Sequence, residues 1–367
     1  MGFHIVKREN CPLIQKCLLY LAAVFFALLM GGVLLLALGV DPFAYYGRMF
    51  TMGTVDNRMP YKIYINYLKE FVPLALTSIA LSLAFKMRFW NIGGEGQFIL
   101  GAITASMVAF KLGPLLPNGV TLLVMCLAAM VVAGLYGLIV AVLKVRFGTN
   151  ETLMTLMLNY IAVYVLNYIG ETKEDWNFFL QADSQRPVFE KFADIAAFPS
   201  IPMGGKFSLN VCVLFTLVIG ALVFIYLKYT KHGYEIAVVG DSAGTARYAG
   251  MKVNVIVLRT VFLSAALIGL AASFKVGTAG VLSTSITDDV GWTGIIVAWL
   301  SQLNTGAIFA VSALISVLNF GSVQAATTFS QVDSSFANML QGVILFLVLA
   351  ADFFIRFKIV RARKGGK

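Results

Sequence analysis

The chain has 367 residues, of which 59% are hydrophobic and 13% are charged, and its formal net charge is +10. Soluble domains contain roughly 45–50% apolar and about 25% charged residues, so this composition excludes an ordinary soluble protein and indicates a membrane protein with many spans. The four cysteines show no metal-like spacing and no disulfide framework, and they are interpreted as small core residues.

Apolar runs are the first feature along the chain. The first run, Cys17–Gly39, follows a basic N-terminus, and it is interpreted as an uncleaved span because it is longer than the apolar core of a signal peptide. Nine further spans are predicted, most of them near the roughly 20 residues that a membrane-crossing helix needs: Ile63–Ala84, Phe98–Phe110, Val120–Leu143, a span that opens at Phe147–Glu151 and ends near Ile169, Phe207–Leu227, Val255–Phe274, Val290–Leu303, Gly306–Phe320 and Phe336–Phe354. The predicted fold is an all-α polytopic membrane protein of about ten helices over residues 1–367.

The charges of the connecting segments set the orientation. Ten spans place both termini on one side, and the segments on that side carry 17 Lys/Arg and 6 Asp/Glu, against 10 and 12 on the other side. The positive-inside rule therefore predicts cytoplasmic termini, a cytoplasmic loop at 231–253 and an extracytoplasmic loop at 170–206. The basic excess faces anionic lipid, so no nucleic-acid partner is implied.

Five spans in each half suggest an inverted repeat, with halves at 17–169 and 207–355. Glycines three apart occur at corresponding places, in Ile92–Gln97 and in Val290–Ile295. Residues 147–149 likewise match residues 320–322. Broken, glycine-containing segments at matching places in two halves are typical of a transport pathway.

Polar residues within or beside the spans are candidates for that pathway, because a polar group in the bilayer is expensive and usually functional. They form a predicted lining or gate at the centre of the protein, and the alternative is that they cap helix ends and hold broken segments together. Trp292 is either an interfacial anchor or a residue that stacks on a ligand ring. The candidates are Asn91, Glu95, Gln97, Asn150, Glu151, Asn159 and Trp292.

The cytoplasmic loop at 231–253 contains a predicted short helix. Asp241 is placed to cap its N-terminus, and Gly250 is placed to end it. Ala243, Ala246 and Gly250 recur at helical spacing, which predicts a face of small residues that could lie in a groove on another protein. The alternative is a solvated connector.

Missing motifs narrow the function further. The triplet Gly204-Gly205-Lys206 lacks the first glycine and the hydroxyl residue of a Walker A sequence, and neither a metal-ligand cluster nor a nucleophile elbow is present. The chain is therefore expected to have no ATPase site of its own, no site for covalent chemistry and no bound cofactor. Two other classes stay open: an ion-coupled transporter that uses Glu95 and Glu151, and an intramembrane enzyme that uses Asp288 and Asp289.

Four motifs carry a family resemblance that covers roughly residues 60 to 355. They are Asn91–Ser106, Thr149–Ala162, Gly233–Met251 and Gly291–Asn304. The first resembles a signature of permease subunits of bacterial ABC importers for ribose, simple sugars, nucleosides and branched-chain amino acids. The second and third resemble the simple-sugar/nucleoside branch, and within it the larger of two paired permeases. The fourth resembles the same branch.

The resemblance implies a type II importer fold and a nucleoside cargo, with a simple sugar as the alternative. It also implies a second homologous permease, which makes a heterodimer, a cytoplasmic subunit that binds and hydrolyses ATP, and an extracytoplasmic solute-binding protein or lipoprotein, all at a bacterial plasma membrane. The loop would be the coupling helix that docks on the ATP-binding subunit. Its expected coupling residues are Glu235, Gly240, Asp241, Ala243, Ala246, Arg247 and Gly250.

Overall fold

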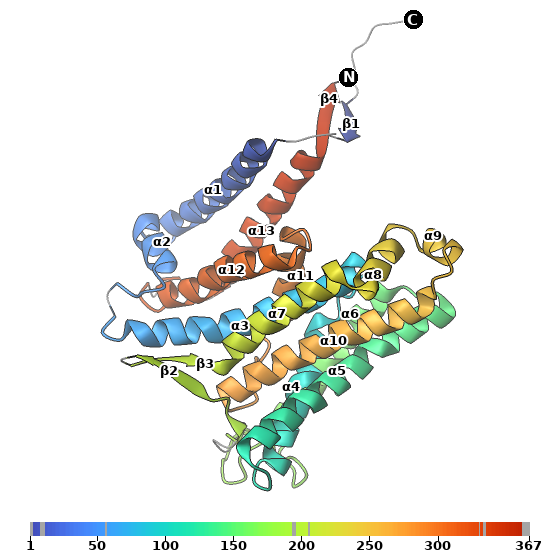
Figure 1. Cartoon of the computed structure of the whole chain (residues 1–367). Helices are drawn as coiled ribbons and strands as arrows, with labels where there is room; N and C mark the ends of the chain where they lie inside the picture. The colour runs from blue at the N-terminus through green and yellow to red at the C-terminus, as the bar shows by residue number, and fades with distance from the viewer. Residues whose placement is uncertain are drawn as a thin grey trace, which may run out of the picture. The chain divides into compact units, whose positions relative to one another are not determined.

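A computed structural model describes residues 3–7, 12–55, 57–192, 196–204, 206–329, 331–332 and 335–361. In these ranges the chain is mainly helical (Figure 1). The helices are α1 (Leu13–Ala37), α2 (Pro42–Phe50), α3 (Pro60–Lys86), α4 (Gly94–Leu112), α5 (Asn118–Phe147), α6 (Glu151–Glu171), α7 (Val211–Tyr229), α8 (Lys231–Asp241), α9 (Ala243–Tyr248), α10 (Val253–Ala279), α11 (Val290–Leu300), α12 (Thr305–Ala326) and α13 (Ser335–Arg356).

The prediction of an all-α polytopic membrane protein is confirmed. Among the described residues, 8 helices are long and apolar enough to cross a membrane. The predicted third and eighth spans correspond to α4 and α11, which are not among those 8. At 1.5 Å per residue α11 covers about 16 Å, roughly half of a 30 Å hydrocarbon core. The count of ten spans stays a prediction.

The chain divides into two compact units. The smaller unit joins Met1–Pro60 to Ile315–Lys367, and the larger is Tyr61–Leu314. These units do not follow the expected halves 17–169 and 207–355, so the inverted repeat stays a prediction.

Long-range contacts close the smaller unit. Helices α1 and α13 pack together, and strand β1 (Phe3–Lys7) pairs antiparallel with β4 (Phe357–Arg361). The buried ring of Tyr45 in α2 contacts Phe336 at a centroid distance of 5.5 Å. The first and last helices therefore belong to one unit.

Helix α4 is the central element of the larger unit. It contacts α5, α10, α6 and α11, and most of its N-terminal half is buried. Glycine and alanine at the crossings allow close packing: a Cβ at Gly101 would overlap the backbone of Gly269, and a Cβ at Gly137 would overlap Ala265. Small residues at such crossings are typical of membrane helix pairs. In Figure 1, α10 runs beside α5 along most of its length.

The segment between α6 and α7 folds onto the end of this bundle. The Asn177 side-chain amide donates to the carbonyls of Ile169 and Thr172, at 2.6 and 2.7 Å, and so satisfies the end of α6. The ring of Phe110 in α4 contacts Phe192 at a centroid distance of 5.6 Å. Strands β2 (Ser200–Gly204) and β3 (Phe207–Asn210) form an antiparallel hairpin.

Candidate functional site

The chain leaves helical geometry between α3 and α4, and buried side chains satisfy the broken backbone. The side-chain amides of Asn91 and Gln97 bond to each other reciprocally, at 3.2 and 3.1 Å. From α6, Asn159 accepts the Gly96 amide at 2.8 Å and donates to the Ile92 carbonyl at 2.9 Å. Asn91, Gln97 and Asn159 thus have a structural role here, and their role in a solute pathway stays a prediction.

The beginning of α11 lies directly on the beginning of α4. The Gly291 amide donates to a carboxyl oxygen of Glu95 at 2.9 Å. A Cβ at Gly291 would overlap the backbone nitrogen of Glu95, and Gly94 lies on the same contact. The two glycine motifs that the sequence placed in separate halves therefore meet at one junction.

This junction lies near the middle of the bundle. A Cβ at Gly137 would touch both Gln97 and Ala265, so these three residues share one level. Ala265 is twelve residues after Val253, or about 18 Å along α10, which has a length of about 40 Å. The broken segment thus lies near half the length of α10, and transporters with interrupted helices bind their cargo near the middle of the bundle.

Helix ends give the junction a distinct charge pattern. The first turn of a helix exposes free amides and carries a partial positive charge. Two such helix ends meet here. Glu95 interacts with both, because it lies in the first turn of α4 and accepts a hydrogen bond from an amide in the first turn of α11. A carboxyl group of the protein itself therefore occupies the place where an anionic solute would bind.

Asn150 and Glu151 are not at this junction, and their predicted position at the centre is wrong. Asn150 caps α6 by accepting the Thr152 amide at 3.0 Å. Glu151 forms an ion pair with Lys144 at 2.7 Å. Glu151 also lines a groove together with Asp241 and other residues of the α8–α9 loop. The turn between α5 and α6 brings them to the loop at 231–253, because α5 is long enough to cross the bundle.

Trp292, in the first turn of α11, is 37% exposed. Its backbone lies next to Glu95, whose carboxyl group its amide also bonds. Neither of its two predicted roles, as an anchor or as a stacking residue, is decided by this position.

The loop at 231–253 contains two short helices rather than one. The cap lies at Ser242, whose hydroxyl accepts the Thr245 amide at 3.2 Å, and the predicted cap Asp241 is instead the last residue of α8. The cap thus lies one residue after the predicted position, and serine and aspartate are both good N-caps. Gly250 ends α9 as predicted: its φ is +77°, and the amides of Gly250 and Met251 bond to the carbonyls of Arg247 and Ala246.

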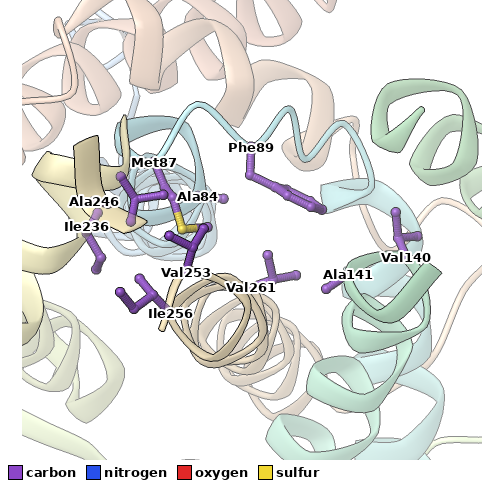
Figure 2. Close-up of a cluster of buried hydrophobic side chains, with 11 residues drawn as sticks. Ala84, Met87, Phe89, Val140, Ala141, Ile236, Ala246, Val253, Ile256 and Val261 are labelled. Carbon is purple, nitrogen blue, oxygen red and sulfur yellow. The ribbon is translucent and has the colours of Figure 1, made fainter. Parts of the chain in front are cut away.

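Ala246 is fully buried, so its expected place on an exposed docking face is wrong. It packs against Met87 at the end of α3, Ile236 of α8 and Ile256 of α10 (Figure 2). Ala243 is half-buried against the same cluster. Two of the three small residues, Ala243 and Ala246, are thus turned toward the chain's own core, whereas Gly250 is exposed.

Gly240 also lies on the side of the loop that packs against the chain's own core. A Cβ at this position would overlap the carbonyl oxygen of Lys86, so α8 touches the last turn of α3 backbone to backbone. The loop is thereby held directly on the helix end that leads into the broken segment at Asn91.

The outward side of the loop is polar and aromatic. Asp241, Gly244, Arg247 and Gly250 are exposed, and Tyr248 is 96% exposed. The side of α9 that carries Arg247 borders the groove that Glu151 also lines.

Glu235 ties α8 to α10. Arg259 donates to its carboxylate at 2.9 Å, and His232 lies 3.4 Å away. The hydrogen bond from Arg259 is the main cause that holds the pKa of Glu235 below its usual value, burial opposes it, and His232 adds to the lowering. These contacts are made within the chain, and the expected coupling role of Glu235 stays a prediction.

We expect Glu235→Gln to lower the thermal unfolding midpoint at pH 7 but not in strong acid. A carboxyl group with a lowered folded pKa stabilises the fold above its unfolded pKa of about 4.3, and this contribution is lost as the pH falls through the folded value. The unfolding midpoints of variant and wild type should therefore converge below about pH 4. Glu171→Gln, which changes an exposed carboxylate, serves as control and should follow the wild type at every pH.

Lys275 is a functional candidate that the sequence did not indicate. Its side chain is 10% exposed, and it bonds to Asp288 at 2.7 Å and to Glu70 at 3.3 Å. A lysine at the last turns of an apolar run is an available signal, but the same pattern fits a lysine that reaches the interface.

A helical bundle with an interruption between α3 and α4 near its middle, and with a short helix docked at that interruption, is typical of membrane transport proteins. The chain belongs to the family described as permease component of branched-chain amino acid transport systems, whose profile matches residues 63–349.

Similar curated proteins support this assignment. The glucose ABC transporter permease of Haloferax volcanii is 28% identical over 91% of this chain and 87% of its own. The guanosine ABC transporter permease of Bacillus subtilis is 25% identical over 82% and 84%. The nucleoside ABC transporter permease of Lactococcus lactis subsp. cremoris is 24% identical over 95% and 94%.

Proposed function

We propose that this chain is the membrane permease of an ATP-driven ABC importer for nucleosides. The family match supports the transport role, and the guanosine and nucleoside permeases among its relatives support the cargo. A simple sugar is the second candidate, because the glucose permease is 28% identical to this chain. Family membership favours ATP-driven import over the ion-coupled and enzymatic alternatives.

The Glu95 junction favours an uncharged solute over an amino acid. The carboxyl group of Glu95 already occupies both helix ends that could neutralise a solute carboxylate, and it accepts a hydrogen bond from the Gly291 amide. A charged solute carboxylate placed there would find no free helix-end amide to neutralise it, because Glu95 already binds there. Nucleosides and simple sugars carry no such charge.

The proposed assembly contains four kinds of partner: a second permease, a cytoplasmic ATP-binding subunit, an extracytoplasmic solute-binding protein and the lipid bilayer of a bacterial plasma membrane, with both termini of this chain in the cytoplasm. The ATP-binding subunit hydrolyses ATP, and this chain binds no cofactor. The charge distribution between the loops supports this orientation.

The coupling route that we propose starts at the outward side of α9. Movement of the ATP-binding subunit would displace α9, whose Ala246 is packed against Met87. Phe89 in the same cluster lies two residues before Asn91. Through Asn91 and Gln97 the displacement would reach the start of α4, on which α11 lies.

The experiment that tests the cargo is uptake into proteoliposomes that contain the whole importer with its binding protein. Labelled guanosine is offered, and unlabelled uridine, glucose and leucine compete. The proposal expects strong competition by uridine and none by leucine. Competition by glucose but not by uridine would assign the sugar role instead, and competition by leucine would contradict the argument from Glu95.

The docking surface makes a separate prediction. We expect Tyr248→Ala and Arg247→Glu to lower solute-stimulated ATP hydrolysis by about tenfold or more, because these side chains are exposed on the proposed contact and aromatic and arginine residues dominate interfaces. Tyr64→Ala, at an exposed tyrosine near the other end of α3, should change it little. Equal effects of the three substitutions would reject α9 as the docking element.

A further inference from the structure

An ion-pair cluster around one nearly buried lysine joins three elements of the larger unit beside α11. Lys275 comes from α10, Glu70 from α3, and Asp288 from the turn that precedes α11. The lysine is nearly buried, whereas the side chains of Glu70 and Asp288 are 35% and 48% exposed. Because a buried charge that lost both partners would be costly, the cluster resists separation of these elements.

The turn that Asp288 belongs to is strained. Asp288 and Asp289 have φ angles of +43° and +56°, and two successive residues with a Cβ in the left-handed region cost free energy. The side chain of Asp289 makes no cap hydrogen bond, although this residue is the N-cap of α11. The turn therefore depends on contacts from outside it to keep its conformation.

The described contacts that hold this turn lie on both sides of it. Before α11, Lys275 binds Asp288 at 2.7 Å. One residue into α11, Gly291 is docked on Glu95. At the far end of α11, Gln302 and Leu303 have φ angles of +50° and +58°. The short helix thus lies between two pairs of left-handed residues, which is the geometry of an element with a hinge at each end.

We infer that Lys275 is a positioning residue for transport, which holds the turn before α11 in the conformation that docks α11 on Glu95. The ion pair stabilises the docked position, and its separation lets α11 move at its two hinges. The link to solute movement rests on the proposed import function. The inference that Lys275 holds the turn does not rest on the import function, because it follows from the ion pair and from the backbone angles of the turn.

Hydrogen–deuterium exchange on the complete importer measures the hold without any transported solute. In Lys275→Met we expect the amides of residues 288–292 to exchange about tenfold faster or more, because removal of the lysine frees the turn. The amides of 100–108 in α4 should be unchanged. Lys275→Arg keeps the charge and should restore slow exchange. Unchanged exchange at 288–292 in Lys275→Met would overturn the inference.

Two adjacent aspartates provide the matched pair for transport. Asp288→Asn weakens the ion pair, whereas Asp289→Asn changes a neighbour with the same backbone conformation and no ion pair to Lys275. We expect uptake to fall about fivefold or more in Asp288→Asn and to stay within about twofold in Asp289→Asn. Equal loss in both would overturn the role of Lys275.

The double variant separates a specific contact from general damage. Lys275→Met combined with Asp288→Asn should lose no more uptake than Lys275→Met alone, since both changes remove one contact. Additive losses would contradict the assignment. If faster exchange appears but no solute is taken up even by the wild-type complex, the ion-pair inference holds and the proposed import function fails.

Discussion

Replacing Gly291 with alanine should abolish transport and destabilise the larger unit. The new Cβ would overlap the backbone of Glu95, and backbone atoms at the start of a buried helix cannot turn aside as a side chain can. Overpacking of this kind typically costs about 1–3 kcal/mol, and we expect the upper part of that range. Thermal unfolding in detergent and uptake in proteoliposomes measure the two effects.

Gly119→Ala is the matched control for that change. Gly119 lies in the first turn of α5, and a Cβ there meets nothing within 4 Å. Alanine is the better helix former, so this variant should be as stable as the wild type or slightly more stable. A Gly291→Ala protein that transports normally would show that α4 and α11 are not in contact during transport.

Ala246→Phe is expected to separate α9 from the rest of the chain. The alanine is fully buried among Met87, Ile236 and Ile256, and a ring has no space in this cluster. The cost should again be about 1–3 kcal/mol, and it acts on a helix of six residues that has little other support. We expect about tenfold or greater loss of coupled ATP hydrolysis together with rapid proteolysis at 242–250.

Thr245→Phe is the matched control, because it adds a ring on the exposed side of the same helix. Thr245 is exposed and directly precedes Ala246, so the substitution adds an equal ring without filling the cluster. Its cap bond to Ser242 uses the backbone amide and is preserved. Protease resistance should therefore match the wild type. Equal sensitivity of both variants would show that bulk on α9, and not the buried contact, is responsible.

The positions of the spans could be predicted because lipid imposes one requirement on every crossing helix, a long apolar run. The starts of α4 and α11 were also visible, since the glycines in Ile92–Gln97 and Val290–Ile295 interrupt such runs. Their mutual contact was not predictable. Residues near 94 and 291 meet only through packing between distant helices, and local periodicity contains no information on that pairing.

The direction in which a helix face points was the second feature that could not be predicted from the sequence. Small residues at helical spacing allow close approach, but the spacing is the same whether the approach is to a partner or to the chain's own core. Ala246 was therefore placed on the wrong side of α9. The ion pairs of Lys275 could not be predicted for a related reason: its partners Glu70 and Asp288 are 205 and 13 residues away in sequence.

The energy source of transport tests the central proposal most directly. Guanosine uptake is measured in proteoliposomes that contain the permeases with or without the ATP-binding subunit, in the presence and absence of internal or external ATP and of a proton ionophore. We predict uptake only with the ATP-binding subunit and ATP on its side of the membrane, unaffected by the ionophore. Uptake that persists without that subunit and collapses with the proton gradient would contradict the proposal and restore Glu95 and Glu151 as ion carriers.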